Sequence, residues 1–310
     1  MNNPVRLTPA ELAHVLPLLL APAGGSLAAG RELVPSFAAY MEQSVPEWVG
    51  WRTGAATRPR ALLLTLLMPG RTALAVLPSP DAHGIDKAAQ SHLMQVGVAA
   101  LADRGLHYAQ ALVEPNADAK RMLLTRVGFT RLAPLVYLER DALYPWVNPP
   151  APEDGEWVNF SDATCAEFEH VILATYQSSL DCPELTGIRP IEDVLAAHRA
   201  AGRFDSRLWE LIRVRGDAAG CLLLAQLPQA GLLEVVYMGV LPEHRGRGVG
   251  AILLRRALEH CRATRTPRLS LVVDDRNAPA QRLYARLGLA PVTRRDAYWF
   301  RWRSSPPGKP

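Results

Sequence analysis

Val240-Leu241-Pro242-Glu243-His244-Arg245-Gly246-Arg247-Gly248-Val249-Gly250 is the stretch that decides the fold. It joins an apolar run, expected to be a strand, to a helix expected over 249–262. The three glycines permit positive φ angles and close approach of a ligand to the backbone. The start of the helix offers unpaired N–H groups and the positive end of the dipole, which together bind phosphate oxygens. Arg245 and Arg247 add positive charge, so the stretch predicts a phosphate-binding turn.

Two common phosphate-binding folds do not fit this turn. No Gly-Lys-Ser/Thr follows it, so it is not the P-loop of an ATPase. A dinucleotide-binding fold opens with the strand before its glycine turn. Here at least two helices and three strands are expected first, so the element order argues against NAD and ATP.

The elements around the turn predict an α+β domain. Close spacing of the first three expected strands indicates an antiparallel meander, and the helix after the turn crosses over to a parallel strand. A mixed, mostly antiparallel sheet flanked by helices is therefore expected. The predicted helices cover 162–177, 191–201, 249–262 and 278–287, and the predicted strands cover 208–214, 219–227, 232–240, 268–273 and 297–302.

Composition is that of a folded, water-exposed protein. The 310 residues carry a net charge of +4, with 49% hydrophobic and 21% charged residues. At roughly 150 residues per domain, this length suggests two domains. The charge is too small to indicate nucleic acid by itself, and no apolar run approaches the roughly 18 residues of a membrane span. We therefore expect neither a nucleic-acid nor a membrane partner.

Cysteine usage and the amino-terminal segment both indicate the cytoplasm. The four cysteines form no Cys-x-x-Cys pair, so a metal or redox motif is not expected. The apolar run 12–22 could be a signal-peptide core. However, Thr8-Pro9-Ala10-Glu11 has the pattern of a capping box with proline at the first helical position. We favour an amphipathic first helix and keep a signal peptide as the alternative.

An internal repeat relates the two halves at a constant offset of 160 residues. The passage ending Arg126-Val127-Gly128-Phe129 aligns with the passage ending Arg286-Leu287-Gly288-Leu289, with Gly128 and Gly288 separated by 160 residues (288 − 128). The same offset places Leu62-Leu63-Leu64 on Leu222-Leu223-Leu224 without a gap. This constant register favours duplication over chance likeness between leucine-rich segments.

The turn and its neighbours resemble the GNAT (general-control-type) N-acetyltransferase superfamily. Arg245-x-x-Gly248-x-Gly250 matches the family's Arg/Gln-x-x-Gly-x-Gly/Ala signature. Asn277-Ala278-Pro279-Ala280 leads to Tyr284 and then to Gly288, as in the family's later motif. The resemblance covers residues 208–303 firmly and 156–207 more weakly. It implies acetyl-CoA as a co-substrate and no metal.

The repeat and the resemblance together predict two tandem GNAT-like domains. Residues 1–143 form the first, 144–155 a proline-rich linker, 156–303 a catalytic domain and 304–310 a flexible tail. In the first copy Ile85, Ala88 and Gln90 stand where the turn has Arg245, Gly248 and Gly250. Leu124 and Leu74 replace Tyr284 and Glu234, and Asp81 and Asp86 oppose phosphate. We expect this degenerate copy not to bind CoA.

The resemblance assigns roles to named residues. It places the CoA diphosphate on the backbone of the turn, and the acetyl carbonyl and pantetheine arm on a strand opened by a bulge. Tyr284 is our candidate acid for the departing thiolate. Glu234 is our candidate base, because it is the one charged residue in the apolar run 220–240, although an outward-facing carboxylate is an equal alternative. The predicted cofactor-binding residues are Met238, Gly239, Val240, Arg245, Gly246, Arg247, Gly248, Val249, Gly250, Ala251, Asn277 and Tyr284.

These roles predict an acetyl-CoA-dependent N-acetyltransferase in which a primary amine attacks directly within a ternary complex. The acceptor, a small molecule or a peptide amine, would bind near segment 158–215, where Tyr176, Asp181, Trp209 and Glu210 are candidates. Arg255, Arg256 and Arg268 could lie near the adenosine phosphates. A non-catalytic acyl-CoA sensor or interaction module is the alternative, and a homodimer is compatible with either reading.

Overall fold

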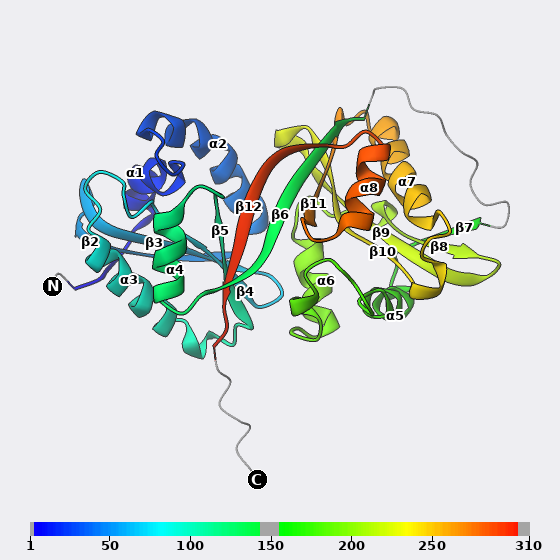
Figure 1. Cartoon of the computed structure of the whole chain (residues 1–310), viewed down its shortest axis with the longest axis horizontal. Helices are drawn as coiled ribbons and strands as arrows, with labels where there is room; N and C mark the ends of the chain where they lie inside the picture. Colours follow the sequence, from blue (N-terminus) through cyan, green and yellow to red (C-terminus); the bar gives the residue numbers. More distant parts are fainter. Residues whose placement is uncertain (1–2, 143–154, 303–310) are drawn as a thin grey trace, which may run out of the picture. The chain divides into compact units, whose positions relative to one another are not determined.

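The computed structural model describes residues 3–142 and 155–302, which form two compact units (Figure 1). The first unit contains the chain up to Leu132 together with the chain from Arg295 onward, and the second contains Ala133–Arg294. The predicted linker 144–155, apart from Gly155, and the predicted tail 304–310 lie outside the described residues.

The first unit is built on a mixed sheet with the strand order β1-β2-β3-β4-β5-β12. Its central strand β3 is apolar on both sides because helices cover both faces of the sheet. β4 and β5 run parallel, and the other pairs are antiparallel. The strands are β1 (Val5–Arg6), β2 (Glu47–Ala55), β3 (Arg58–Met68), β4 (Thr72–Val76), β5 (Tyr108–Val113) and the end of β12 (Ala290–Phe300).

Helices α1 (Pro9–Leu20) and α2 (Leu27–Ser44) cover one face, where they pack on Leu62, Leu64 and Leu66. Helices α3 (Lys87–Ala99) and α4 (Asp118–Arg126) cover the other, where they meet Leu63 and Leu67. The predicted capping box is confirmed, since Thr8 and Glu11 each accept the other's backbone N–H. Such reciprocal caps satisfy two of the free donors of a helix start.

The second unit repeats this plan with the strand order β6-β11-β10-β9-β8-β7. β10 and β11 run parallel and the remaining pairs are antiparallel, as the sequence predicts. The strands are β6 (Thr130–Asp141), of which residues 133–141 belong here, β7 (Gly155–Asn159), β8 (Trp209–Val214), β9 (Asp217–Leu227), β10 (Leu232–Val240) and β11 (Arg268–Asp274).

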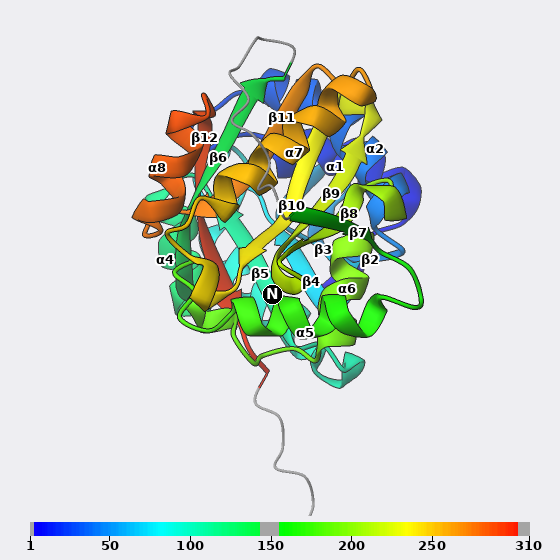
Figure 2. The same cartoon turned by 90° about the vertical axis from the view of Figure 1, so that its right-hand side faces the viewer.

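Helices also cover both faces of the second sheet. α5 (Cys165–Thr175) and α6 (Ile191–Arg199) enclose Trp209 and Leu223 on one face. α7 (Val249–Ala263) and α8 (Ala278–Arg286) enclose Leu222 and Leu224 on the other. Figure 2 shows α7 lying across β9 and β10. Single 3₁₀ turns span Ala102–Arg104, Pro183–Leu185, Ser206–Leu208, Pro228–Ala230 and Pro242–His244.

The elements recur at the offset predicted from the sequence. Helices α4 and α8 differ by 160 at both ends (278 − 118 and 286 − 126), and β5 and β11 differ by 160 at their starts (268 − 108). Strands β6 and β12 also begin 160 residues apart (290 − 130). The repeat therefore extends from local sequence to the order and length of the elements.

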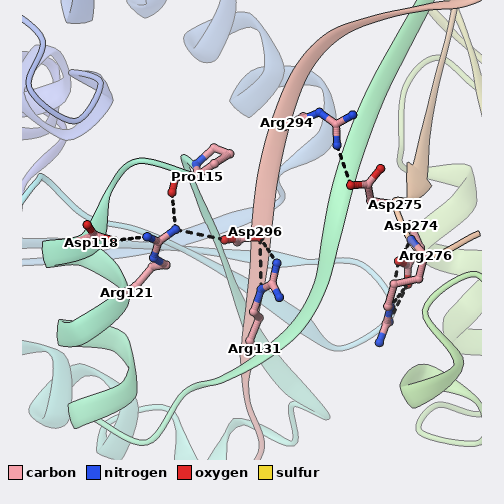
Figure 3. Close-up of polar contacts among 9 residues, drawn as sticks. All are labelled: Pro115, Asp118, Arg121, Arg131, Asp274, Asp275, Arg276, Arg294 and Asp296. Atoms are coloured by element: carbon pink, nitrogen blue, oxygen red, sulfur yellow. Dashed lines mark hydrogen bonds and ion pairs between the residues drawn. The ribbon is translucent and has the colours of Figure 1, made fainter.

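The compact units do not coincide with the sequence halves, because the last strand of each half pairs in the sheet of the other. Residues 135–141 of β6 pair with β11 in the second unit, and residues 296–300 of β12 pair with β5 in the first. Figure 3 shows the ion pairs of Arg121 and Arg131 with Asp296 in the first unit and of Arg294 with Asp275 in the second. The bounds 1–143 and 156–303 remain a prediction about duplicated copies.

Two elements begin more than two residues away from the sequence prediction, while the other boundaries agree within two residues. The last strand begins at Ala290 rather than 297, because the polar stretch 290–296 lacks the apolar alternation that marks a strand. The helix expected over 162–177 is shorter, Cys165–Thr175, with Thr164 at its N-cap position. Among the described residues, none of the helices is both long and apolar enough to cross a membrane.

Candidate functional site

A β-bulge opens the second sheet between β10 and β11. The register of β10 against β9 shifts between Val235 and Tyr237. Parallel pairing of β10 with β11 stops at Val235 and Leu271, although β10 continues to Val240 and β11 to Asp274. A bulge bends its strand away from the neighbour. The bulge that we expected near Met238 therefore lies just before it, and it leaves one edge of β10 unpaired.

The turn after β10 presents a row of free amide donors. Gly246 and Gly248 have φ angles of 74° and 85°, which favour glycine. Gly248 is the N-cap of α7 and supplies no side-chain cap. Within the described part of the chain, the backbone N–H groups of residues 246–250 have no acceptor. Five consecutive free donors at a helix start are suited to binding an anion.

The open strand edge and the turn line one cavity of about 620 Å³. Its wall comes from the end of α5, the strand β10, the start of α7 and the helix α8. Of the predicted cofactor-binding residues, Arg247 alone is not part of this wall, although it belongs to the same turn. The cavity brings together Met238, Gly239, Val240, Arg245, Gly246, Gly248, Val249, Gly250, Ala251, Asn277 and Tyr284.

The side chain of Arg245 points toward the protein rather than to a free anion. Its guanidinium donates to three backbone carbonyl oxygens at 2.9–3.3 Å, those of Thr175, Ser178 and Val240. It therefore ties the end of α5 and the following loop to the end of β10. We expected this residue to add charge for a phosphate, and its structural role was not visible in the sequence because the carbonyls lie far away in the chain.

Tyr284 lies on the cavity wall with its hydroxyl free. The residue is 8% exposed, and its hydroxyl has no hydrogen-bond partner among the described residues. Burial raises the pKa of Tyr284, and the nearby carboxylate of Asp181 raises it further. The phenol therefore stays protonated at neutral pH and can donate a hydrogen bond or a proton into the cavity.

Glu234 lies on β10 just before the bulge and is not part of the cavity wall. Its carboxylate has no hydrogen bond or ion pair within the described part of the chain, and burial alone raises its pKa to about 7. This agrees with the expectation of an isolated, perturbed carboxylate. A proton could reach it from the cavity only through a relay such as a water molecule.

The four acceptor candidates separate into two pairs. Tyr176 and Asp181 line the cavity. Trp209 is fully buried in the core, and Glu210 is buried against Arg256 and His260 at 2.6 and 2.7 Å. Sequence patterns did not separate these pairs, because burial depends on the packing of α5, α6 and α7.

The arginines proposed for adenosine phosphates lie elsewhere. Arg256 pairs with Glu210 and Arg268 pairs with Glu139, and neither lines the cavity. Two arginines on α8, Arg282 and Arg286, line it instead. Their spacing of four residues on one helix face was the available signal. Asn277 caps α8 by accepting from the N–H of Ala280, and it also lines the cavity.

The corresponding part of the first unit is filled by its own side chains. Asp86 is the N-cap of α3 and accepts the N–H of Ala89. The buried amide of Gln90 bonds the N–H and the carbonyl of Leu62 at 3.0 and 2.7 Å. β4 ends at Val76, so Gln90 takes the place that Met238 of β10 holds beside Leu222 in the second unit.

The site of this α+β protein thus consists of a cavity in which a row of free amides lies beside an open strand edge. No group of three or more potential metal ligands occurs among the described residues. Residues 172–289 match the Acetyltransferase (GNAT) family model. Over these residues, which make up less than half of the chain, the second unit is similar to GNAT acetyltransferases.

Particular relatives agree with this family and with the two-part layout. The chain is 33% identical over 183 residues to a mycothiol acetyltransferase of Beutenbergia cavernae, which covers 55% of this chain and 59% of the relative. The match thus spans less than two thirds of the relative's length. The likeness in layout to mycothiol synthase, suggested by length and duplication, is consistent with this match.

Two solved structures share the fold over nearly the whole chain. A GCN5-related N-acetyltransferase from Sphaerobacter thermophilus has a TM-score of 0.65 at 18% identity and covers 97% of this chain and 96% of its own. A tandem GNAT protein from the clavulanic acid biosynthesis pathway has a TM-score of 0.57 at 16% identity, with 99% and 100% covered. The fold is therefore that of two tandem GNAT-like domains.

Proposed function

We propose that this chain transfers an acetyl group from acetyl-CoA to a primary amine, by direct attack within a ternary complex in the second unit. The observation that carries the proposal is the row of unpaired N–H groups at residues 246–250, set beside the open edge of β10. Backbone donors at a helix start suit the two negative phosphates of a CoA diphosphate.

The open edge of β10 suits the other end of the same ligand. Beyond Val235 the amides on this edge are free of β11, so those near Met238 could hold the thioester carbonyl and the oxyanion that forms on attack. Acetyl-CoA supplies the activated acyl group, and the chain supplies binding, orientation and proton transfer.

Proton transfer is assigned to Tyr284 and Glu234. Tyr284 lines the cavity, stays protonated and has no hydroxyl partner among the described residues, so it suits the role of acid toward a departing thiolate. Glu234, with a pKa raised to about 7, suits a base that takes a proton through a relay. A base titrating near neutrality is effective at physiological pH.

Direct attack is favoured over a covalent acyl-enzyme. None of the cysteines lines the cavity. Burial raises the pKa of the Cys182 and Cys221 thiols to about 12. A thiol that holds its proton so tightly is a poor nucleophile.

Calorimetry and a turnover assay test the proposal. Titration with CoA should give one site per chain, and incubation with acetyl-CoA and a panel of primary amines should consume the thioester. Thioester absorbance or mass spectrometry is the suitable readout, because all four cysteines are free and would react with thiol reagents. Absence of CoA binding would refute the site, and binding without turnover of any amine would leave only the non-catalytic module.

A further inference from the structure

The cavity wall carries cationic side chains and a single carboxylate. Arg245, Arg282 and Arg286 line it together with the free amides at the start of α7, and the Arg245 guanidinium is bonded to the carbonyls of Thr175 and Ser178. Asp181 is the one acidic residue among the lining residues. A lone carboxylate in such a wall marks where a positively charged group of a ligand would bind.

The carboxylate of Asp181 is held firmly in this wall. Its Oδ1 accepts the backbone N–H of Asp274 at 2.8 Å, and its own N–H donates to Ser179 Oγ at 3.2 Å. The next residue, Cys182, donates its N–H to Asp274 Oδ2 at 3.2 Å. Asp274 is fully buried and paired with Arg276 at 2.6 Å, as Figure 3 shows. The loop and the end of β11 therefore interlock, which positions Asp181.

Asp181 has no cation of its own among the described residues. Its Oδ2 accepts no hydrogen bond there, and the nearby guanidinium of Arg276 is engaged by Asp274 and Glu184. Asp181 is exposed at the cavity surface, and partial desolvation by the surrounding protein raises its pKa. An incompletely compensated carboxylate on a cavity wall favours a cationic ligand.

The neighbouring groups also lack partners or offer aromatic faces. Tyr284 is 92% buried (100 − 8), its hydroxyl is unpartnered, and it lies close enough to Asp181 for the carboxylate to raise its pKa. The rings of Tyr176 and Tyr237 meet edge to face at 5.9 Å beside them. A carboxylate beside aromatic rings is a common arrangement for binding an ammonium group.

We propose that Asp181 is the docking carboxylate for the acceptor, which arrives as a cationic primary amine and is held with its nitrogen beside Tyr284. The ammonium group must pass one proton through the relay to Glu234 before the neutral nitrogen attacks the thioester. This inference rests on the proposed function and makes Asp181 a specificity residue. Tyr176 and Tyr237 would contribute apolar contact around the ammonium group. A neutral acceptor, such as an alcohol, would lack the interaction.

The test compares two ligands of the same shape that differ in charge. Binding of n-butylammonium and of 1-butanol to the full chain saturated with CoA is measured by ligand-observed NMR, so that no turnover occurs. We expect the ammonium to bind at least about tenfold more tightly. Asp181→Asn should remove this preference while leaving CoA affinity unchanged, because asparagine keeps the Oδ1 acceptor for Asp274. Asp162→Asn, a change at an exposed aspartate outside the cavity, should preserve it.

Equal binding of both ligands, or a preference that survives in Asp181→Asn, would overturn the inference. A loss of stability without a change in preference would show that Asp181 is only structural. The proposed function is tested by a separate measurement, since it is refuted if the chain does not bind CoA. The ligand comparison can then be repeated on the free chain, and it still decides whether Asp181 selects a cation.

Discussion

The two units start their crossover helices in opposite ways, and the contrast explains where a ligand can bind. At α3 of the first unit, Asp86 caps the helix and Gln90 fills the space beside β3. At α7 of the second unit, Gly248 and Gly250 leave the amides free and β10 continues along β9. The same helix start is thus either capped by side chains or left open, depending on a few residues.

The difference also concerns the strand before the helix. β4 ends at Val76, whereas β10 is bulged and runs four residues farther in the equivalent numbering (240 − 236). In the first unit the side chain of Gln90 satisfies backbone groups that a strand satisfies in the second. A duplicated fold can therefore lose a ligand site while every backbone group keeps a partner.

The largest effect is expected from giving the second helix start an acidic group like that of the first. Gly248→Glu places a carboxylate in the row of amides, where a like charge at about 4 Å costs about 4 kcal/mol at an intermediate effective dielectric. CoA affinity should fall about 1,000-fold in calorimetry.

Gly216→Glu is the matched control for this substitution. Its φ of 87° is close to the 85° of Gly248, and it also has open space around it, but it does not line the cavity. Unchanged CoA affinity in Gly248→Glu, or equal losses in both variants, would break the proposed contrast between the two helix starts.

A smaller effect, a loss of turnover, is expected when a polar residue of α8 is replaced by an apolar one, as in the first unit. Leu124 stands in the first unit where Tyr284 stands in the second. Tyr284→Phe should lower kcat about 100-fold, since a positioned acid contributes roughly that much. CoA affinity should stay within a factor of about two, because the ring remains. A fully active variant would remove the acid role.

The next prediction concerns the stability of the first unit. Gln90→Ala leaves the buried N–H and carbonyl of Leu62 without partners, and each such group costs about 1–3 kcal/mol. We expect urea unfolding to show a loss of about 2–3 kcal/mol. Replacement of the exposed His92 by alanine provides a control on the same helix. A stability equal to that of the wild type would show that Gln90 is not needed to close this unit.

The smallest effect is expected at Glu234, where the first unit has Leu74. Its folded-state pKa of about 7 lies above the ordinary 4.5, so the folded chain holds the proton more tightly than the unfolded chain. Stability is therefore lost as the pH rises from about 4.5 through 7. Glu234 is partly exposed, so solvent screening reduces the effect to roughly half of what the full shift would give. Glu234→Gln should therefore be more stable than wild type by about 1–2 kcal/mol at pH 8 and equal to it near pH 4.5. A difference that does not depend on pH would contradict this account.

Much of the fold followed from local patterns. The turn at residues 246–250, the capping box at Thr8 and the strand Leu232–Val240 are each marked by neighbouring residues, and the structure has them where the patterns put them. The repeat added the order of the elements in the first half. Within the candidate site, Tyr284 could be anticipated because a motif and a helix face coincide there.

Other features depend on residues far apart in the chain. The contacts of Arg245 with Thr175 and Ser178 span about seventy residues, and those of Asp181 with Asp274 span more than ninety. Asp181 lines the cavity whereas Glu210 is buried, and this difference also depends on contacts between distant segments. Local periodicity carries no information on which distant segment will pack against it.

The sequence by itself determined the duplicated α+β plan, the phosphate-type turn and its confinement to the second half, because backbone conformation and helix capping depend on adjacent side chains. Tertiary structure alone decided that β6 and β12 pair with strands of the opposite half, that Arg245 binds carbonyls, and that Asp181 faces the cavity. Strand pairing and burial are settled by the free energy of the whole packed unit, in which many distant contacts act together.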